Sequence, residues 1–179
     1  MHFTLSYSGP LHANGKPKKK QAIRRQFHLQ LKNVVEGIPG LQHIFGDKCE
    51  SCGFQDPTCF EEFCFQPIIT EKRGLVSKLD ITWLRPEPPG RIFTTSGDID
   101  NRLKTLFDAL SVPSHNNQLP NDDEPQDGES PFYCLLEDDN LITSIAVDTD
   151  TLWETEVGKN DVVLLIRVEI GPIHGDPHK

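Results

Sequence analysis

The chain has 179 residues, 36% of them hydrophobic, and a formal net charge of −9 at pH 7. This length suits one domain with a core of its own, and the negative charge excludes a protein that coats DNA through a uniformly basic surface. No apolar run approaches the roughly 20 residues that span a bilayer, and the N-terminus lacks the basic and long apolar regions of a secretory signal. We therefore expect one cytoplasmic domain without a membrane segment.

The charges are separated along the sequence. Residues 1–25 contain six basic side chains and no acidic one, whereas residues 111–140 contain eight acidic side chains and no Lys or Arg. A protein with separate poles can bind a polyanion with one of them. The basic pole consists of Lys16, Lys18, Lys19, Lys20, Arg24 and Arg25.

The N-terminal part predicts a strand over residues 2–8, a loop over 9–15 and a helix from about Lys18 to Glu36. The helix has an apolar stripe at three- and four-residue spacing, made by Ile23, Phe27, Leu31 and Val34 or Val35. Basic residues at a helix start oppose the helix dipole but favour a bound anion. By charge alone, a phosphate-binding end and a solvated lysine tract are equally good interpretations.

The rest of the chain is predicted to form several strands and one further helix. A cysteine-rich segment covers residues 41–67, and a hairpin is predicted from strands at 75–83 and 91–95. A second helix begins at Asp98 or Asp100 and is stopped by Pro113, and the Pro-rich segment 111–131 predicts a flexible acidic loop. Strands follow at 132–137, 141–149 and 161–170, the last of them apolar enough to be covered on both faces, and the tail from Gly171 is expected to be loose.

Carboxylates recur on both sides of the acidic loop. Asp98 and Asp100 are two residues apart at the start of a helix, Lys104 follows one turn later, and Asp139 precedes a strand. Carboxylates that a fold gathers repel each other unless a cation lies among them, and an all-oxygen ligand set favours Mg²⁺ or Mn²⁺. Such sites commonly activate water against a phosphodiester. Taken separately, a D-x-D at a helix start is more often a cap, and an Asp-Asp before a strand is more often a turn.

Together and in this order, the two clusters resemble a known family. The segment from Gly97 to Leu110, GDIDNRLKTLFDAL, resembles the D-[LI]-D-N-x-x-K-x-x-x-D-A-L segment of the RusA-type Holliday-junction resolvases. Residues 137–142, EDDNLI, resemble that family's later D-D-x-x-[IV] segment. The resemblance covers most of the chain outside residues 41–67 and 111–131, and the order of elements agrees with it.

The resemblance implies a RusA-like α+β fold, with a mixed sheet flanked by two helices, over residues 1–179. It also implies a homodimeric, Mg²⁺-dependent endonuclease that resolves branched DNA in recombination and repair. The family's essential carboxylates fall on Asp98, Asp100 and Asp139, its catalytic lysine falls on Lys104, and Asp138 could assist. Asp108 is expected to be structural. We assign the basic pole, Lys16 to Arg25, to DNA phosphates.

Four of the five cysteines lie within the cysteine-rich segment, in the pattern Cys49-x2-Cys52-x6-Cys59-x4-Cys64. Thiolate pairs at short spacing suit tetrahedral Zn²⁺, which would make the segment a zinc-binding insertion. The alternative is an insertion with reduced, unliganded thiols, because disulfides are rare in the cytoplasm. Cys134 lies in a predicted strand and is expected to be a small core residue.

A second function fits the net charge. The chain can be a non-catalytic adaptor that keeps the resolvase scaffold and binds a protein partner through the cysteine segment or the acidic loop. Dependence of DNA cleavage on Mg²⁺ separates this adaptor from the nuclease.

Overall fold

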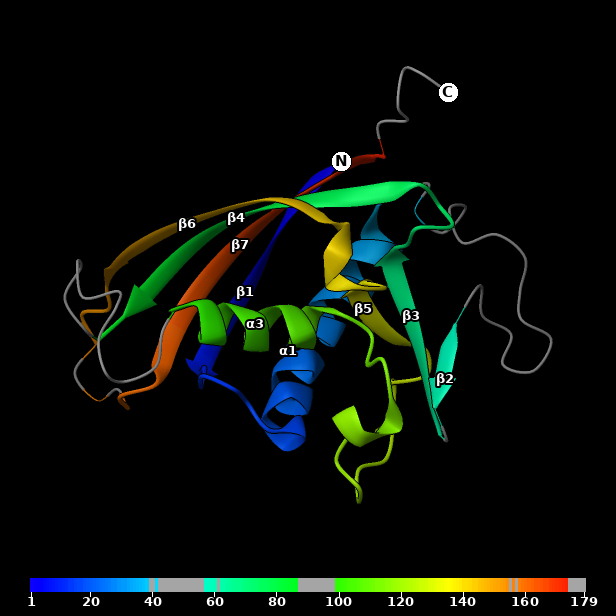
Figure 1. Ribbon diagram of the computed structural model, residues 1–179, viewed down its shortest axis with the longest axis horizontal. Coiled ribbons are helices and arrows are strands. Elements are labelled where there is room, and N and C mark those ends of the chain that lie inside the picture. Colours follow the sequence, from blue (N-terminus) through cyan, green and yellow to red (C-terminus); the bar gives the residue numbers. More distant parts are fainter. Residues whose placement is uncertain are drawn as a thin grey trace.

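The computed structural model describes residues 1–38, 41, 57–60, 62–86, 99–154, 156 and 158–173. Within these residues the fold contains two α-helices and two β-sheets (Figure 1). The elements are β1 (His2–Pro10), α1 (Pro17–Gly37), β2 (Thr58–Phe60), β3 (Phe63–Ile69), β4 (Leu75–Arg85), α3 (Ile99–Leu110), η1 (Asn116–Gln118), β5 (Phe132–Leu136), η2 (Asp139–Leu141), β6 (Ile142–Thr151) and β7 (Asp161–Pro172). The predicted mixed α+β class is confirmed. No helix among the described residues is long and apolar enough to cross a membrane.

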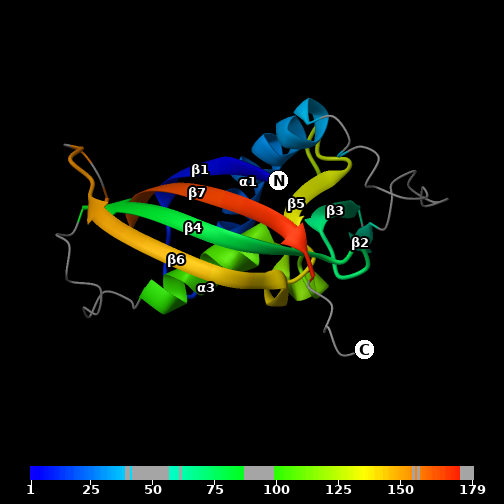
Figure 2. The same cartoon turned by 90° about the horizontal axis from the view of Figure 1, so that it is seen from above.

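The larger sheet has the order β1-β7-β4-β6, in which β4 runs parallel to β6 and antiparallel to β7. Both α1 and α3 lie on one face of this sheet, and the view in Figure 2 looks onto the other face, which no helix of the described residues covers. The expectation that residues 161–170 are covered on both faces is therefore wrong. Leu164 and Ile166 of β7 point into the core, whereas Leu165 between them is 46% exposed and Arg167 is also exposed.

The predicted hairpin partner of β4 has no edge to occupy. Residues 75–84 of β4 pair with β7 on one side, and residues 77–85 pair with β6 on the other. Both edges of β4 are therefore taken along the strand. The predicted second strand, residues 91–95, lies outside the described residues.

The smaller sheet has the order β2-β3-β5, and β3 runs parallel to β5. The sequence did not predict β2 or β3, because both lie largely in the cysteine-rich segment. Phe63 and Phe65 of β3 pack with Phe132 and Cys134 of β5 in a core cluster of their own. The C-terminal part of the cysteine-rich segment thus belongs to the core of the protein, and Cys134 is buried as expected.

The apolar stripe predicted for the first helix is confirmed. Ile23, Phe27, Leu31 and Val35 are all buried in the main core, together with Leu106 and Leu110 of α3. Trp83 of β4 is 1% exposed and lies in the same core. Burying one such side chain stabilises the fold by roughly 1.5–3 kcal/mol.

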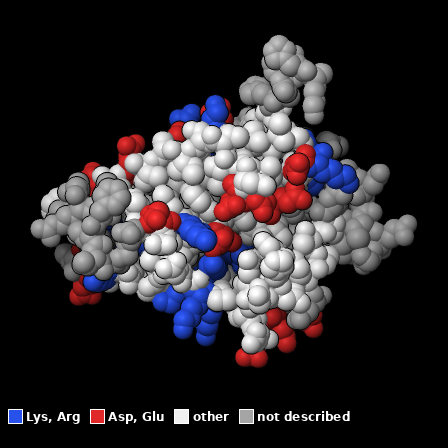
Figure 3. Space-filling model, in the orientation of Figure 1, with Lys and Arg blue, Asp and Glu red and all other residues white. Residues whose placement is uncertain are grey.

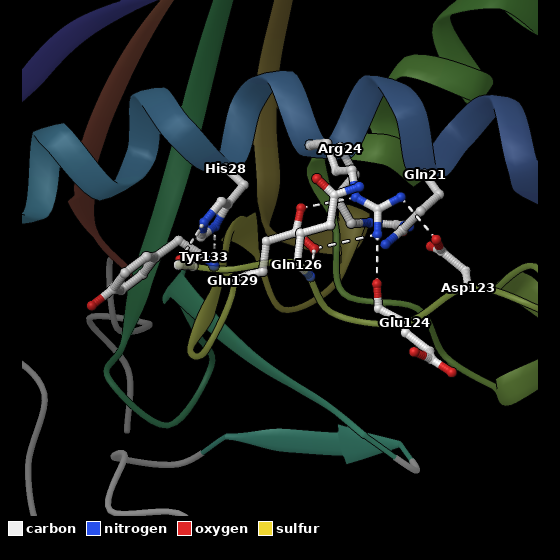
Figure 4. A network of polar contacts seen from close by, with 10 residues as sticks. Gln21, Arg24, His28, Asp123, Glu124, Gln126, Glu129 and Tyr133 are labelled. Atoms are coloured by element: carbon white, nitrogen blue, oxygen red, sulfur yellow. Dashed lines mark hydrogen bonds and ion pairs between the residues drawn. The ribbon is translucent and has the colours of Figure 1, made fainter.

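Segment 111–131 is attached to α1 by a polar network (Figure 4). The guanidinium of Arg25 donates to Asp123 Oδ1 at 2.8 Å, to Glu129 Oε1 at 2.8 Å and to the carbonyl of Glu124 at 2.9 Å. These contacts leave the acidic segment less freedom than its composition predicts, because several of its carboxylates and carbonyls are bound to one cation.

His28 of α1 holds the end of the same segment. Its Nδ1 accepts the backbone N–H of Tyr133 at 2.8 Å, and its Nε2 lies 3.2 Å from the carbonyl oxygen of Gly128. Both contacts are satisfied at once by the neutral ring with its proton on Nε2. Burial is the main cause that lowers the pKa of His28 below the ordinary 6.5.

This arrangement makes stability depend on pH. The pKa of His28 is lower in the folded than in the unfolded protein. The stability that the neutral His28 ring contributes is therefore fully present above pH 6.5 and is lost as the pH falls below that value. Urea unfolding of the wild type should therefore give a lower free energy at pH 5.5 than at pH 7.5. His28→Asn keeps an acceptor at the position of Nδ1 and does not titrate, so its loss between the two pH values should be smaller. An equal loss in both proteins would show that His28 is not the titrating group.

Candidate active site

Three charged side chains lie along one face of α3. Asp100, Lys104 and Asp108 follow each other at four-residue spacing, which places them on the same face over about 12 Å. Asp100 and Lys104 are exposed and Asp108 is half-buried, whereas Leu106 and Leu110 on the opposite face enter the core. Asp98, the first predicted ligand, lies outside the described residues.

Asp139 faces the C-terminal half of this row. It begins η2, and α3 and η2 are in contact. Burial and the nearby carboxylates of Asp138 and Asp108 raise the pKa of Asp139, while Lys104 lowers it. The structure thus brings Asp139 together with Lys104 and Asp108, residues more than 30 positions earlier in the chain. Asp100 lies one turn beyond Lys104 on the same face.

The two carboxylates before Asp139 have structural partners. Glu137 Oε2 accepts the backbone N–H of Glu71 at 2.9 Å, which ties β5 to the turn between β3 and β4. Asp138 Oδ1 accepts the backbone N–H of Asn140 at 2.9 Å and so shapes η2. Asp139 accepts no comparable backbone N–H among the described residues, and its side chain is hydrogen-bonded to that of Asp138.

The start of α1 lies against α3 because a glycine allows it. The backbone N–H of Gly15 donates to Thr105 Oγ1 at 2.9 Å, and a Cβ at position 15 would lie 2.6 Å from Thr105 Cγ2. Lys16 follows as the N-cap of α1, with no acidic residue in the first turn. This close approach brings the predicted basic pole beside the carboxylates of α3.

The six residues of that pole have different environments. Lys16, Lys18 and Lys19 are exposed, and Lys20 Nζ lies 2.6 Å from Asp108 Oδ2. Arg24 is 1% exposed, and its NH2 donates to the carbonyl of Asp108 at 2.8 Å. The assignment of Arg24 to phosphate binding is corrected, since a buried guanidinium bonded to the protein cannot reach DNA. Arg25 is likewise committed to Asp123 and Glu129.

The surface over this region is mixed in charge. Figure 3 shows carboxylates gathered where η2 lies in Figure 1, with Lys and Arg side chains next to them in the direction of α3 and α1. A hollow of about 340 Å³ adjoins η2 and is lined by Glu71, Glu137 and Asp138 among other residues. The positive and negative groups are therefore neighbours on one face, although the sequence separates them.

The carboxylates near Asp139 meet only some of the requirements of the Mg²⁺ or Mn²⁺ site that the sequence predicts. The carboxylates of Asp138 and Asp108 contribute to the raised pKa of Asp139, and oxygen donors suit Mg²⁺ or Mn²⁺. Within the described ranges, which lack Asp98, no three His, Cys, Asp or Glu side chains form a group that could hold a metal ion. A complete ion site would need Asp98 or a rearrangement of Asp108 and Asp100.

Two of the four cysteines in the predicted zinc motif lie in the described strands. Cys59 of β2 and Cys64 of β3 are opposite each other in the antiparallel pair and are joined by a disulfide bond. This differs from the expected free thiols, and in this form neither sulfur is a thiolate ligand. Cys49 and Cys52 lie outside the described residues, so zinc binding by the four cysteines stays a prediction.

Comparison with known proteins adds no assignment. No family model matches the chain, and no curated protein matches it either. The likeness to the RusA-type resolvases therefore rests on the residues themselves. The sequence placed Lys20 in the basic pole and Asp108 among the structural residues, but it did not predict the ion pair that joins them. The regular spacing of Asp100, Lys104 and Asp108 was the available signal for Asp108.

Ionised Asp139, close to Asp138 and Asp108, should lower the free energy of unfolding at neutral pH. The folded pKa of Asp139 is raised above its ordinary 3.8, so ionised Asp139 opposes folding once the pH rises above that value. In EDTA at pH 7, Asp139→Asn should unfold at the same or a higher temperature, with a gain of at most about 0.5 kcal/mol because the group is exposed.

Asp138→Ala is the matched control for this measurement. It removes the acceptor for Asn140 N–H and should lower stability by roughly 0.5–1.5 kcal/mol. A drop for Asp139→Asn as large as the drop for Asp138→Ala would show that Asp139 is a structural residue and not a free ligand.

Proposed function

We propose that the protein is a RusA-like, divalent-cation-dependent endonuclease that cleaves Holliday junctions or related branched DNA. The observation that supports this proposal is the meeting of Asp139 with the charged row on α3. The family motif predicts that these two segments work together, and they are 31 residues apart between Asp108 and Asp139. Gathering acidic side chains on a surface is unfavourable for folding, which points to a ligand that offsets their repulsion.

Asp98, Asp100 and Asp139 are the residues that would hold Mg²⁺ or Mn²⁺. The ion would supply Lewis-acid activation for hydrolysis of a phosphodiester. Lys104 lies on the same helical face as Asp100, where its ammonium would bind a phosphate oxygen and stabilise the charge that develops during the reaction. Asp138 shapes η2 and would act on the site through Asp139.

The DNA strand would follow the start of α1. Lys16, Lys18 and Lys19 are exposed there, and a helix N-terminus without acidic residues attracts phosphate. These three cations lie close together in the sequence, so a protein of net charge −9 would still bind DNA locally. Two symmetric nicks in a four-way junction require two active sites, so we propose that the active form is a homodimer.

The first test is cleavage of a labelled four-way junction with and without Mg²⁺. Asp100→Asn removes one charge from the exposed row and should lower the cleavage rate at least about a hundredfold while junction binding in EDTA is retained. Asp80→Asn is the matched control, because Asp80 is an exposed aspartate on the uncovered face of β4. Full cleavage by Asp100→Asn would remove this assignment.

The second test is the salt dependence of junction binding. Lys18→Ala and Lys19→Ala should each weaken binding and reduce the slope of log K against log salt by about one. Lys78→Ala, on the sheet face that no helix covers, should leave the slope unchanged. Equal slopes for all three variants would show that the DNA does not contact the start of α1.

The adaptor function makes a different prediction for the same samples. It is favoured by the net charge and by the hollow beside η2, whose lining carboxylates would suit a basic partner segment. A folded wild type that cuts no branched DNA in Mg²⁺ or Mn²⁺ would support the adaptor over the nuclease.

A further inference from the structure

A hollow of about 420 Å³ lies between α1 and segment 111–131. One wall comes from the helix and the other from the segment, and the lining includes Lys18, Gln21, Arg25, Pro120 and Asp123. Pockets for small ligands commonly have volumes of roughly 300–1,000 Å³. The residues of η2 line a different hollow, so this one is separate from the carboxylates discussed above.

The amide of Gln21 has an unused donor at this hollow. Gln21 is 1% exposed, and its Oε1 accepts a hydrogen bond from Arg24 NH1. Because a guanidinium has only donors, this contact fixes which end of the amide faces Arg24 and turns Nε2 away from it. Nε2 is buried and has no hydrogen-bond partner among the described residues. Such a donor lowers stability unless a ligand or a water accepts its hydrogen.

The carboxylate of Asp123 has an unused acceptor on the opposite wall. Its Oδ1 accepts from Arg25 NH1 at 2.8 Å, whereas its Oδ2 is buried and has no partner in the described part of the chain. Figure 4 shows Gln21 on α1 and Asp123 on the segment below it in that view. Since Arg24 and Arg25 hold the two side chains in place, the hollow has one fixed donor and one fixed acceptor.

The charges at the hollow favour a neutral polar ligand over a phosphate. Arg25 lies in the wall, but Asp123 and Glu129 each bind its guanidinium at 2.8 Å and neutralise it. The second carboxylate of the lining, Asp122, repels an anion. The same ion pairs hold the planar guanidinium rigidly, and nucleobases stack on arginine planes of this kind.

Every nucleobase carries a hydrogen-bond donor beside an acceptor on its Watson–Crick edge, and this edge is free only when the base is unpaired. We propose that the hollow binds an unpaired base of the DNA strand, whose edge accepts from Gln21 Nε2 and donates to Asp123 Oδ2. Lys18 lines the same hollow and belongs to the helix start along which the strand is proposed to run. The inference rests on the proposed function and narrows its substrate to branched DNA with an unpaired base at the branch.

The test compares two fluorescein-labelled four-way junctions, which bind the full chain in EDTA and are followed by fluorescence anisotropy. One junction has a single unpaired adenine at the branch, and the other has an abasic site at the same position. The wild type should bind the first about tenfold more tightly, as two hydrogen bonds of ordinary strength allow.

Two conservative variants change the hydrogen bonding without removing the contacts to the arginines. Gln21→Glu replaces the free donor by an acceptor, and Asp123→Asn replaces the free acceptor by a donor. Each should lower the preference for the unpaired adenine to about twofold or less. The variants are independent of each other, so either one decides the question if the other does not fold.

Asn117→Ala is the matched control. Asn117 is exposed and lines a neighbouring hollow, which shares Pro120 and Asp123 with the proposed site. The control should keep the preference of the wild type, and an equal loss in all three variants would overturn the placement of the base. Adenosine monophosphate alone tests for a free nucleotide. If it binds the wild type as tightly as the junction does, the assignment to a DNA strand is overturned.

The outcomes also separate this inference from the function on which it rests. A wild type that cleaves a four-way junction in Mg²⁺ but binds the two labelled junctions equally overturns the base site and leaves the nuclease standing. A wild type that prefers the unpaired adenine but cuts no branched DNA keeps the base site and overturns the nuclease. A wild type that binds neither junction overturns both.

Discussion

The buried guanidinium of Arg24 is the contact on which the site depends. It lies on α1, donates to the carbonyls of Asp108 and Ser111 at the end of α3, and sits 5.9 Å above the ring of Phe65 in β3. A buried charge is costly unless its donors are bonded, and the C-terminal carbonyls of a helix are partners of the right sign. One side chain thereby holds α1, α3 and the smaller sheet in a fixed relation.

Because α1, α3 and the smaller sheet are held together, the surface around η2 can carry several carboxylates that repel one another. Arg24 anchors the backbone under Asp108, and Asp138 and Glu137 use their carboxylates to shape η2 and the neighbouring turn. Asp139 is then presented without a backbone partner among the described residues. Natural proteins accept such local costs at functional sites when the surrounding structure is stable enough to support them. Among the described residues, Glu137 and Asp138 thus fix the backbone around η2, and Asp139 does not.

The sequence predicted the elements whose patterns are local. Ile23, Phe27 and Leu31 define the buried face of α1 by their spacing alone, and the apolar run of residues 161–170 marks β7 as a strand. Which elements cover a strand depends on the rest of the fold and cannot be predicted from the residues of the strand alone. The apolar run of β7 suggested two covered faces, whereas the fold places its helices on one face only.

Pairing over long distances explains the other differences. The sequence could not show that β6 and β7 occupy both edges of β4, nor that β3 pairs with β5 across more than 60 residues. The roles of Arg24 and Arg25 also depended on distant partners, the end of α3 and residues 123–129. The meeting of Asp139 with Asp98 and Asp100, which the family resemblance implies, stays a prediction: the described residues place Asp139 near Lys104 and Asp108, and they leave out Asp98.

The pairing of β1 with β7 has a consequence for how the chain folds during synthesis. Residues 2–10 form their ladder with residues 161–169, and the N-terminal ammonium of Met1 donates to the carbonyl of Ile170. Because β7 lies between β1 and β4, the first strand has no neighbour in the sheet until the last one leaves the ribosome. Ladders of such sequence separation form slowly, so we expect β1 to join the sheet late in folding.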